Sequence, residues 1–163
     1  MGLAKQLMFI AAIALTGVTL FGQPDASRET KKTPMITVSG TFDVKILPPS
    51  RPASDDGFVR LSIDKTFQGA LDGTSRVEMM ATSDGRTPSG GYVALERFTG
   101  KLDGKSGSFI MQHSATMSPG SSEMNIVVSP GSGSGALAGI TGTLEIRQEG
   151  KQHFYTLRYT LPQ

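Results

Sequence analysis

The chain has 163 residues, which is the size of one domain, and its hydrophobic fraction of 37% is that of a globular rather than a disordered protein. Sixteen basic residues against fourteen acidic ones give a net charge of +2, so the sequence lacks the strong positive field that favours nucleic-acid binding. Cysteine is absent, which excludes disulfides and a lipid-modified cysteine.

The first 22 residues differ from the rest of the chain. A single positive charge at Lys5 precedes the apolar run QLMFIAAIALTGVTLFG. A short basic start before an apolar core is typical of a secretory signal peptide. The alternative is a membrane anchor, because the run approaches spanning length, but no basic cluster follows it directly. We therefore predict a signal peptide at 1–22, an exported protein (periplasmic or extracellular), and no stable membrane span after cleavage.

Residues 23–34 are polar and rich in turn formers, which predicts a flexible leader before a single domain at 35–163. Beyond Pro34 the apolar residues recur with period two, which predicts strands rather than helices. In MITVSGTFDVKIL one face carries Ile36, Val38, Phe42, Val44 and Ile46, and FVRLSIDKTF alternates in the same way. Further strands are predicted at 75–82, 91–98, 107–117, 123–129, 142–147 and 153–161.

Glycine and proline mark the connections between these predicted strands. The stretch PPSRPASDDG at 48–57 interrupts regular structure, because its prolines remove backbone donors and fix φ. Sequential short hairpins favour an up-and-down barrel over a Greek-key sandwich, which needs long crossovers. We predict an all-β fold, an eight-stranded antiparallel up-and-down β-barrel of lipocalin-like size. Such an interior holds side chains or one small ligand.

Two stretches nearly repeat each other, FQGALDGTS at 67–75 and FTGKLDGKS at 98–106. Calcium binding is not expected, because each copy offers one carboxylate and calcium uses several oxygen ligands. We interpret both copies as strand–turn–strand corners, in which Asp-Gly forms the tight turn and Leu packs inward.

The glycine-rich passage SPGSGSGALAGITG at 129–142 is similar in composition to phosphate-binding loops. Such loops need backbone N–H groups that lead into a helix N-terminus. Here the strand-like segment GTLEI follows instead, so we predict a hairpin loop and a strand with glycines at a bend.

Several segments resemble the bacterial family of unknown function DUF3224. They are SGTFDVKI at 39–46, SIDKTFQGALDGTS at 62–75, GYVALERFTGKLDGKSGSFIMQHSATM at 91–117, SGSGALAGITGTLEI at 132–146 and HFYTLRYTL at 153–161. The resemblance implies an eight-stranded antiparallel barrel related to the allene oxide cyclase and dirigent barrels, and it implies no activity. Two departures are Val77, where the family usually has Gly, and the long connection at 48–57.

The candidate site depends on the register of the hairpin between the predicted strands at 91–98 and 107–117. If Phe98 pairs with Phe109, then Glu96 and His113 lie diagonally on the inner face, within reach of each other. A carboxylate beside a histidine inside an apolar barrel would set its tautomer and raise its basicity.

Three tyrosines, Tyr92, Tyr155 and Tyr159, are predicted to face the same interior space as Glu96 and His113 and are candidate ligand-binding residues with them. The pair alone is also the candidate for acid–base catalysis, but a purely structural role, in which the two buried groups satisfy each other, is favoured over both functional roles. Asp64 and Glu78 are expected to pair on the surface with Arg60, Lys65 or Arg76. His113 and His153 lack a third ligand at close spacing, so neither a metal nor a cofactor is expected.

Three functional hypotheses follow. The first is an exported barrel that binds a small, mostly apolar molecule. The second, by analogy with allene oxide cyclase, is a cofactor-independent isomerase or cyclase. The third is a structural or homo-oligomeric protein with a filled barrel, whose outer face carries Met80, Val93, Leu95 and Ile110.

Overall fold

The computed structural model describes residues 33–48, 56–84 and 86–162. The signal peptide predicted at 1–22, most of the leader at 23–34 and the middle of the 48–57 connection lie outside the described residues. The described residues form strands and no helix, and so contain no helix able to cross a membrane. The strands are β1 (Ile36–Ile46), β2 (Val59–Gly69), β3 (Leu71–Ala81), β4 (Gly90–Leu102), β5 (Lys105–Ser118), β6 (Ser121–Val128), β7 (Ser134–Gly135), β8 (Thr141–Glu149) and β9 (Gln152–Thr160).

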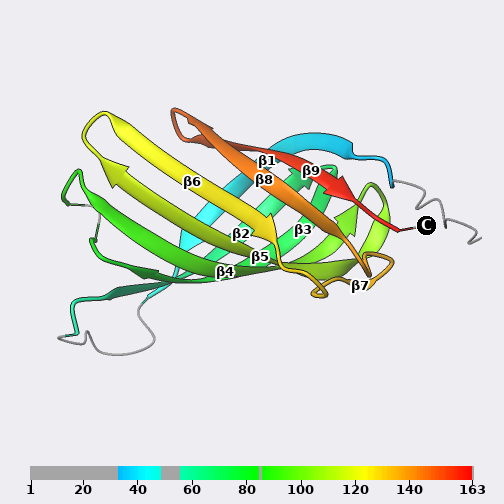
Figure 1. The fold of residues 1–163 in the computed structure, drawn as a ribbon, viewed down its shortest axis with the longest axis horizontal. Helices are drawn as coiled ribbons and strands as arrows, with labels where there is room; N and C mark the ends of the chain where they lie inside the picture. The colour runs from blue at the N-terminus through cyan, green and yellow to red at the C-terminus, as the bar shows by residue number, and fades with distance from the viewer. Residues whose placement is uncertain (1–32, 49–55, 85, 163) are drawn as a thin grey trace, which may run out of the picture. The chain divides into compact units, whose positions relative to one another are not determined.

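Eight of these strands close an antiparallel barrel (Figure 1). Each strand from β1 to β6 pairs with the next, β6 pairs with β8, β8 pairs with β9, and β9 returns to β1. The short strand β7 lies outside this ring and pairs with β5. The predicted all-β, eight-stranded up-and-down barrel is therefore confirmed, and its closure removes the long free edges that an open sheet would expose.

The two LDG copies lie beside each other in neighbouring strands. Leu71 of the first copy pairs with Leu102 of the second, and both side chains are buried. The second copy turns at Asp103 and Gly104, both of which have positive φ as the predicted tight turn requires. The prediction for the first copy is wrong, because the chain already reverses around Gly69 and Ala70. Its Asp-Gly pair therefore lies inside β3.

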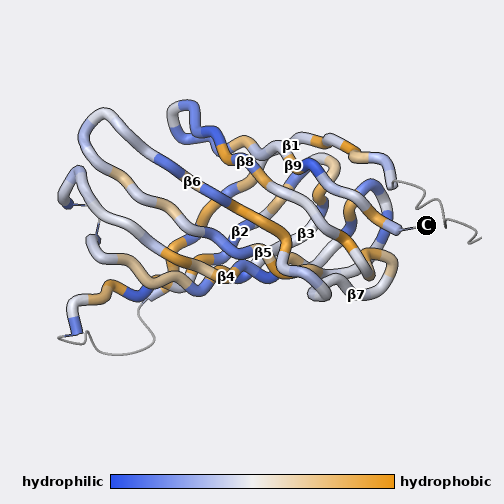
Figure 2. Tube along the Cα trace, viewed as in Figure 1, coloured by the Kyte–Doolittle hydropathy of each residue, from blue (hydrophilic) through white to orange (hydrophobic). Residues whose placement is uncertain are grey.

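One end of the barrel is packed shut by aromatic rings and leucines. Phe67 packs against Phe42, Phe98 and Tyr155, with ring centroids 5.2 to 5.6 Å apart. The glycine-rich passage after β6 adds Leu137 and Ile140, whose side chains are fully buried, before it enters β8. The predicted loop and strand are confirmed for this passage. Figure 2 shows hydrophobic residues where β6 runs toward this closed end.

The opposite end of the barrel is open. Inward-facing residues near the far ends of their strands remain exposed: Ile46 by 62%, Met124 by 48% and Met117 by 41%. The ring also has its fewest strand pairings on this side, because β6 and β8 pair only at Val127 and Thr143. Toward the left of Figure 1 the two strands, β6 in yellow and β8 in orange, diverge. The barrel is therefore a cup with a packed base and an open mouth.

The close approach of the two LDG copies generates the first prediction. A Cβ at Gly100 would lie 2.3 Å from the Asp72 carbonyl oxygen and 2.7 Å from the Gly73 Cα, both in the backbone of β3. Gly100→Ala must therefore push two paired strands apart, and we expect it to lower the free energy of unfolding by about 1–3 kcal/mol. Urea unfolding measures this loss.

The matched control for that measurement is Gly120→Asn. Gly120 has a φ of +78°, and a Cβ added there would have no neighbouring atom within 4 Å. Asparagine tolerates this conformation, so the control should cost far less. Equal losses in the two variants would contradict the close-packing argument.

Candidate functional site

The centre of the candidate site is the carboxylate of Glu96, whose residue is only 1% exposed. The predicted register is confirmed, since Phe98 pairs with Phe109 and Ala94 pairs with His113. As a result the Glu96 and His113 side chains meet diagonally across β4 and β5. The Nε2 atom of His113 lies 2.9 Å from Oε2 of Glu96.

Glu96 has two further partners that were not predicted from the sequence. Lys65 in β2 places its Nζ atom 2.7 Å from Glu96 Oε2, and the hydroxyl of Ser75 in β3 donates to Glu96 Oε1 at 2.5 Å. Lys65 was expected on the surface, but it is 8% exposed and faces inward. The alternation of β2 carried the signal, because Lys65 shares its face with Ile63 and Phe67.

The acidic residues next to this cluster in sequence lie on the outer face, as expected. Asp64 forms an ion pair with Arg76 at 2.7 Å, and Glu78 accepts a hydrogen bond from Ser62 at 2.7 Å. The outward row of charges on β2 and β3 is therefore separate from the inward row that contains Lys65.

The cluster rests on the aromatic layer of the closed end. The ammonium group of Lys65 lies 4.9 Å from the centroid of the Phe42 ring, a distance at which a cation is attracted to the ring face. Phe42 in turn stacks on His153, with ring centroids 5.1 Å apart. Lys65 is thus enclosed between the Glu96 carboxylate and the Phe42 ring, and its charge is neutralised by Glu96.

The charges around Glu96 decide its protonation state. Burial by itself would raise the pKa of the Glu96 carboxyl, but the contact with His113 and the charge of Lys65 outweigh burial and lower the pKa from 4.5 to about 2. Glu96 is therefore ionised at neutral pH.

The polar groups of the site differ in their access to a ligand. His113 Nε2 is fully buried 2.9 Å from Glu96 Oε2, the oxygen that Lys65 also contacts, and it makes no hydrogen bond to any other described group. Tyr92 is half-buried on the same inner face, and burial followed by the charge of Glu96 raises the pKa of its hydroxyl. Within the described residues the Tyr92 hydroxyl makes no hydrogen bond, so it is available to a ligand.

A cavity of about 420 Å³ lies in the mouth of the cup. Its inward-facing lining is mostly apolar and consists of Leu61, Met79, Ala81, Tyr92 and Met117, with the turn before β4 at its rim. Met79 pairs with Ala94, which pairs with His113, so the cavity begins one ladder step above Glu96. Its volume is within the roughly 300–1,000 Å³ of small-molecule sites.

The structure places Tyr155 and Tyr159 at the closed end, away from this cavity. The Tyr155 hydroxyl accepts a hydrogen bond from the Leu71 N–H at 2.7 Å, and the Tyr159 hydroxyl donates to Asp103 Oδ2 at 2.8 Å. Each tyrosine therefore supports the corner of one LDG copy. Of the five predicted ligand-binding residues, the structure brings together Tyr92, Glu96 and His113.

A second feature lies on the outer face of β3 to β6. Met80, Val93 and Leu95 are 39%, 58% and 56% exposed, and Ile110 at the edge of the same face is half-buried. Two neighbouring grooves of about 750 and 540 Å³ adjoin this face, and the larger one is also lined by Tyr92 and Met124, which face inward.

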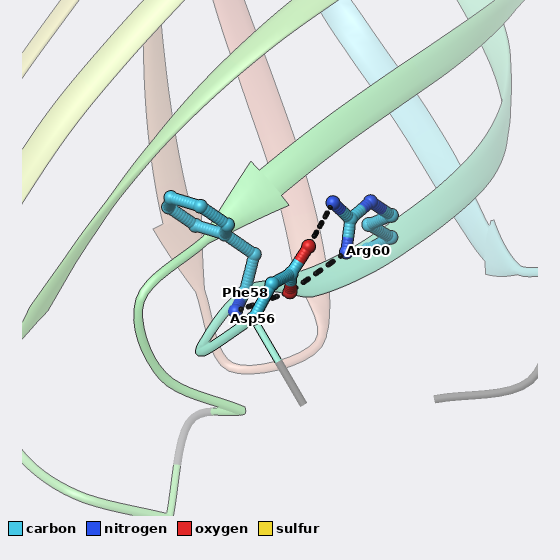
Figure 3. Close-up of polar contacts among 3 residues, drawn as sticks. All are labelled: Asp56, Phe58 and Arg60. Carbon is cyan, nitrogen blue, oxygen red and sulfur yellow. Dashed lines mark hydrogen bonds and ion pairs between the residues drawn. The ribbon is translucent and has the colours of Figure 1, made fainter. Parts of the chain in front are cut away.

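Phe58 covers one end of that outer face and is fixed by its neighbours. Asp56 accepts hydrogen bonds from the Phe58 N–H at 3.1 Å and from the Arg60 guanidinium at 2.6 and 3.2 Å, and Figure 3 shows Asp56 between the two. The Phe58 side chain is 47% exposed and lines the larger groove. No group of three potential metal ligands occurs among the described residues.

The shifted pKa of Glu96 generates a pH prediction. Because the folded-state pKa of about 2 lies below the ordinary 4.5, Glu96 contributes stability above pH 4.5 that is lost as the pH falls toward 2. The shift corresponds to roughly 3 kcal/mol in the free energy of unfolding. Urea unfolding from about pH 5 to about pH 2 measures this loss.

The comparison for that measurement is the double variant Lys65→Met, Glu96→Gln. Replacement of a buried ion pair by uncharged residues is often tolerated, so we expect the variant to fold. Between about pH 5 and about pH 2, its free energy of unfolding should fall by roughly 3 kcal/mol less than that of the wild type. The same acid sensitivity in both proteins would show that Glu96 does not carry the effect.

Comparison with known proteins places the chain in a family. Residues 38–159 match the model of a family described as protein of unknown function (DUF3224). A crystal structure of a protein with unknown function from the DUF3224 family of Shewanella oneidensis is similar, with 39% sequence identity and a TM-score of 0.71 over 80% of this chain and 99% of that chain. No curated protein matches the chain. The sequence match and the shared barrel agree, and the chain belongs to the DUF3224 family.

Proposed function

We propose that this protein binds a small, mostly apolar molecule in the mouth of its barrel. The observation that carries the proposal is a mostly apolar cavity of about 420 Å³ that is lined by flexible apolar side chains and by Tyr92, whose hydroxyl makes no hydrogen bond within the described residues. Glu96 and Lys65 form the polar floor below this cavity. The apolar segment at 1–22 supports an exported protein, periplasmic or extracellular, and we include that location in the proposal.

The lining of the cavity supports an apolar body for the ligand. Leu61, Met79 and Met117 supply flexible apolar surface around the mouth. Burial of such surface stabilises a complex by roughly 25 cal/mol for each Å² removed from water. A few convergent polar groups at the base of an apolar cavity are the usual means of fixing ligand orientation.

The chemistry of Glu96 favours binding over acid–base catalysis. A general base works best when its pKa lies near the operating pH, whereas the Glu96 pKa is held at about 2. Its two oxygens are also occupied by Lys65 and Ser75. Glu96 is therefore a positioning residue in this proposal, and the isomerase or cyclase alternative has less support.

Two adjacent methionines on opposite faces of β3 provide a matched test. Met79 faces the cavity, whereas Met80 faces outward and is 39% exposed. Met79→Trp should fill the cavity and weaken binding of the neutral apolar dye Nile red by roughly tenfold or more, about 1.4 kcal/mol. Met80→Trp should leave the affinity unchanged. Fluorescence titration measures both.

Circular dichroism on the same samples checks that both tryptophan variants fold. Loss of dye binding in Met80→Trp alone would place the dye on the outer face and overturn the lumen site. Native mass spectrometry of protein purified from its own host gives an independent readout, since a bound small molecule should copurify with wild type and not with Met79→Trp.

A second candidate function is self-association through the outer face of β3 to β6. Val93 and Leu95 are more than half exposed there, which is unusual for neighbouring large apolar residues of one strand. The face is flanked by Arg97 and Glu123, and neither has an ion-pair partner among the described residues. Opposite charges beyond an apolar centre make the face complementary to a second copy of itself.

The self-association proposal predicts that Leu95→Lys converts a dimer into a monomer. A lysine at the centre of an apolar interface is buried without a partner, whereas Thr74→Lys on the polar outer face should have no effect. Light scattering coupled to size-exclusion chromatography measures the mass. A wild-type protein that stays monomeric at high concentration would remove this candidate and leave the ligand proposal intact.

A further inference from the structure

We infer that the ligand carries a neutral polar head, a hydroxyl or a carbonyl, and that the site discriminates against carboxylates and ammonium groups. This inference rests on the proposed function and specifies the chemical class of the ligand. It follows from how the charges at the base of the cavity are arranged.

The first step is that the floor of the cavity is neutral as a unit. The Lys65 ammonium and the Glu96 carboxylate are 2.7 Å apart and compensate each other. Ser75 occupies the second oxygen of Glu96, and the Phe42 ring covers the ammonium from below. Neither charge is left over to attract a charged ligand.

The second step is that the free polar group of the cavity suits a neutral head. The Tyr92 hydroxyl lines the cavity and both donates and accepts. A ligand hydroxyl also does both, and a carbonyl accepts from a donor. Such a head satisfies Tyr92 without bringing a net charge into a site whose nearest residues are apolar or already paired.

The third step concerns a charged head at the same place. A carboxylate at the base of the cavity would lie near Lys65 and Glu96 together, and their ion pair of 2.7 Å offers it no net opposite charge. The loss of its hydration is therefore not offset, which makes its transfer into the site costly. An ammonium group meets the same uncompensated desolvation cost. The wild-type floor therefore disfavours both signs of charge.

The fourth step is that removal of one partner should change this preference. Glu96→Gln keeps the shape of the side chain but leaves Lys65 uncompensated, so the floor becomes positive. Lys65→Met leaves Glu96 uncompensated, so the floor becomes negative. The double variant is neutral again. The ion pair thus predicts three head-group preferences from one cavity, which a purely structural pair would not produce.

The experiment compares decanol, decanoate and decylammonium, three probes with the same chain length, by displacement of Nile red at neutral pH. Wild type should bind decanol at least roughly tenfold more tightly than either ion. Glu96→Gln should shift the preference toward decanoate, and Lys65→Met should shift it toward decylammonium. The double variant should prefer decanol again.

The control variant is Glu145→Gln, which removes an outer-face carboxylate paired with Arg158 and should leave every affinity unchanged. If a single variant does not fold, the wild type, the other single variant and the double variant still test the inference. Equal or tighter binding of decanoate to wild type overturns it, as does an unchanged preference in the folded single variants.

The outcomes also separate this inference from the proposal beneath it. If Nile red and all three probes fail to bind wild type, the proposed lumen site itself is overturned. If the dye and the probes bind but do not distinguish head groups, the lumen site stands and the neutral-head inference is wrong.

Discussion

The buried carboxylate of Glu96 is the constraint on which the upper barrel depends. A charge removed from water must be paired, and its partners come from three other strands: Lys65 on β2, Ser75 on β3 and His113 on β5. A shift of one residue in any of these pairings would turn a partner outward and leave Glu96 uncompensated. The cluster therefore selects the register of four adjacent strands, and the cavity above it inherits its shape from that register.

The two ends of the barrel differ in how their interiors are packed. At the closed end, aromatic rings and leucines fill the interior, and Tyr155 and Tyr159 fasten the corners of the two LDG copies. At the open end, the same alternation of side chains leaves apolar residues such as Met117 exposed, because no plug covers them. A fully packed barrel would have no such surface. The free-energy cost of exposing apolar side chains therefore falls at the mouth, where we propose that a ligand binds.

Period-two alternation and the short connections were sufficient to predict the barrel. With the turn of the second LDG copy they also predicted the pairing of Phe98 with Phe109 and the meeting of Glu96 with His113. The alternation also placed Lys65 on the inner face, but a lysine beside Asp64 is usually solvated, and that general expectation outweighed the pattern. The positions of Tyr155 and Tyr159 along the barrel depend on strand tilt and closure, which alternation does not encode. The turn of the first LDG copy was misplaced because Gly69, three residues before Asp72, offers a second reversal point.

The position of the ion pair is itself an argument about its role. Buried ion pairs often contribute little net stability, and apolar residues of similar volume serve a core equally well or better. The closed end of this barrel follows that rule, since its interior is apolar apart from tyrosine hydroxyls bonded to the turns. The pair instead occurs below the cavity, with His113 Nε2 2.9 Å from the same carboxylate. In the proposed function, a neutral ion pair at that boundary offers no net charge to a charged head group, whereas removal of either partner would leave a net charge there.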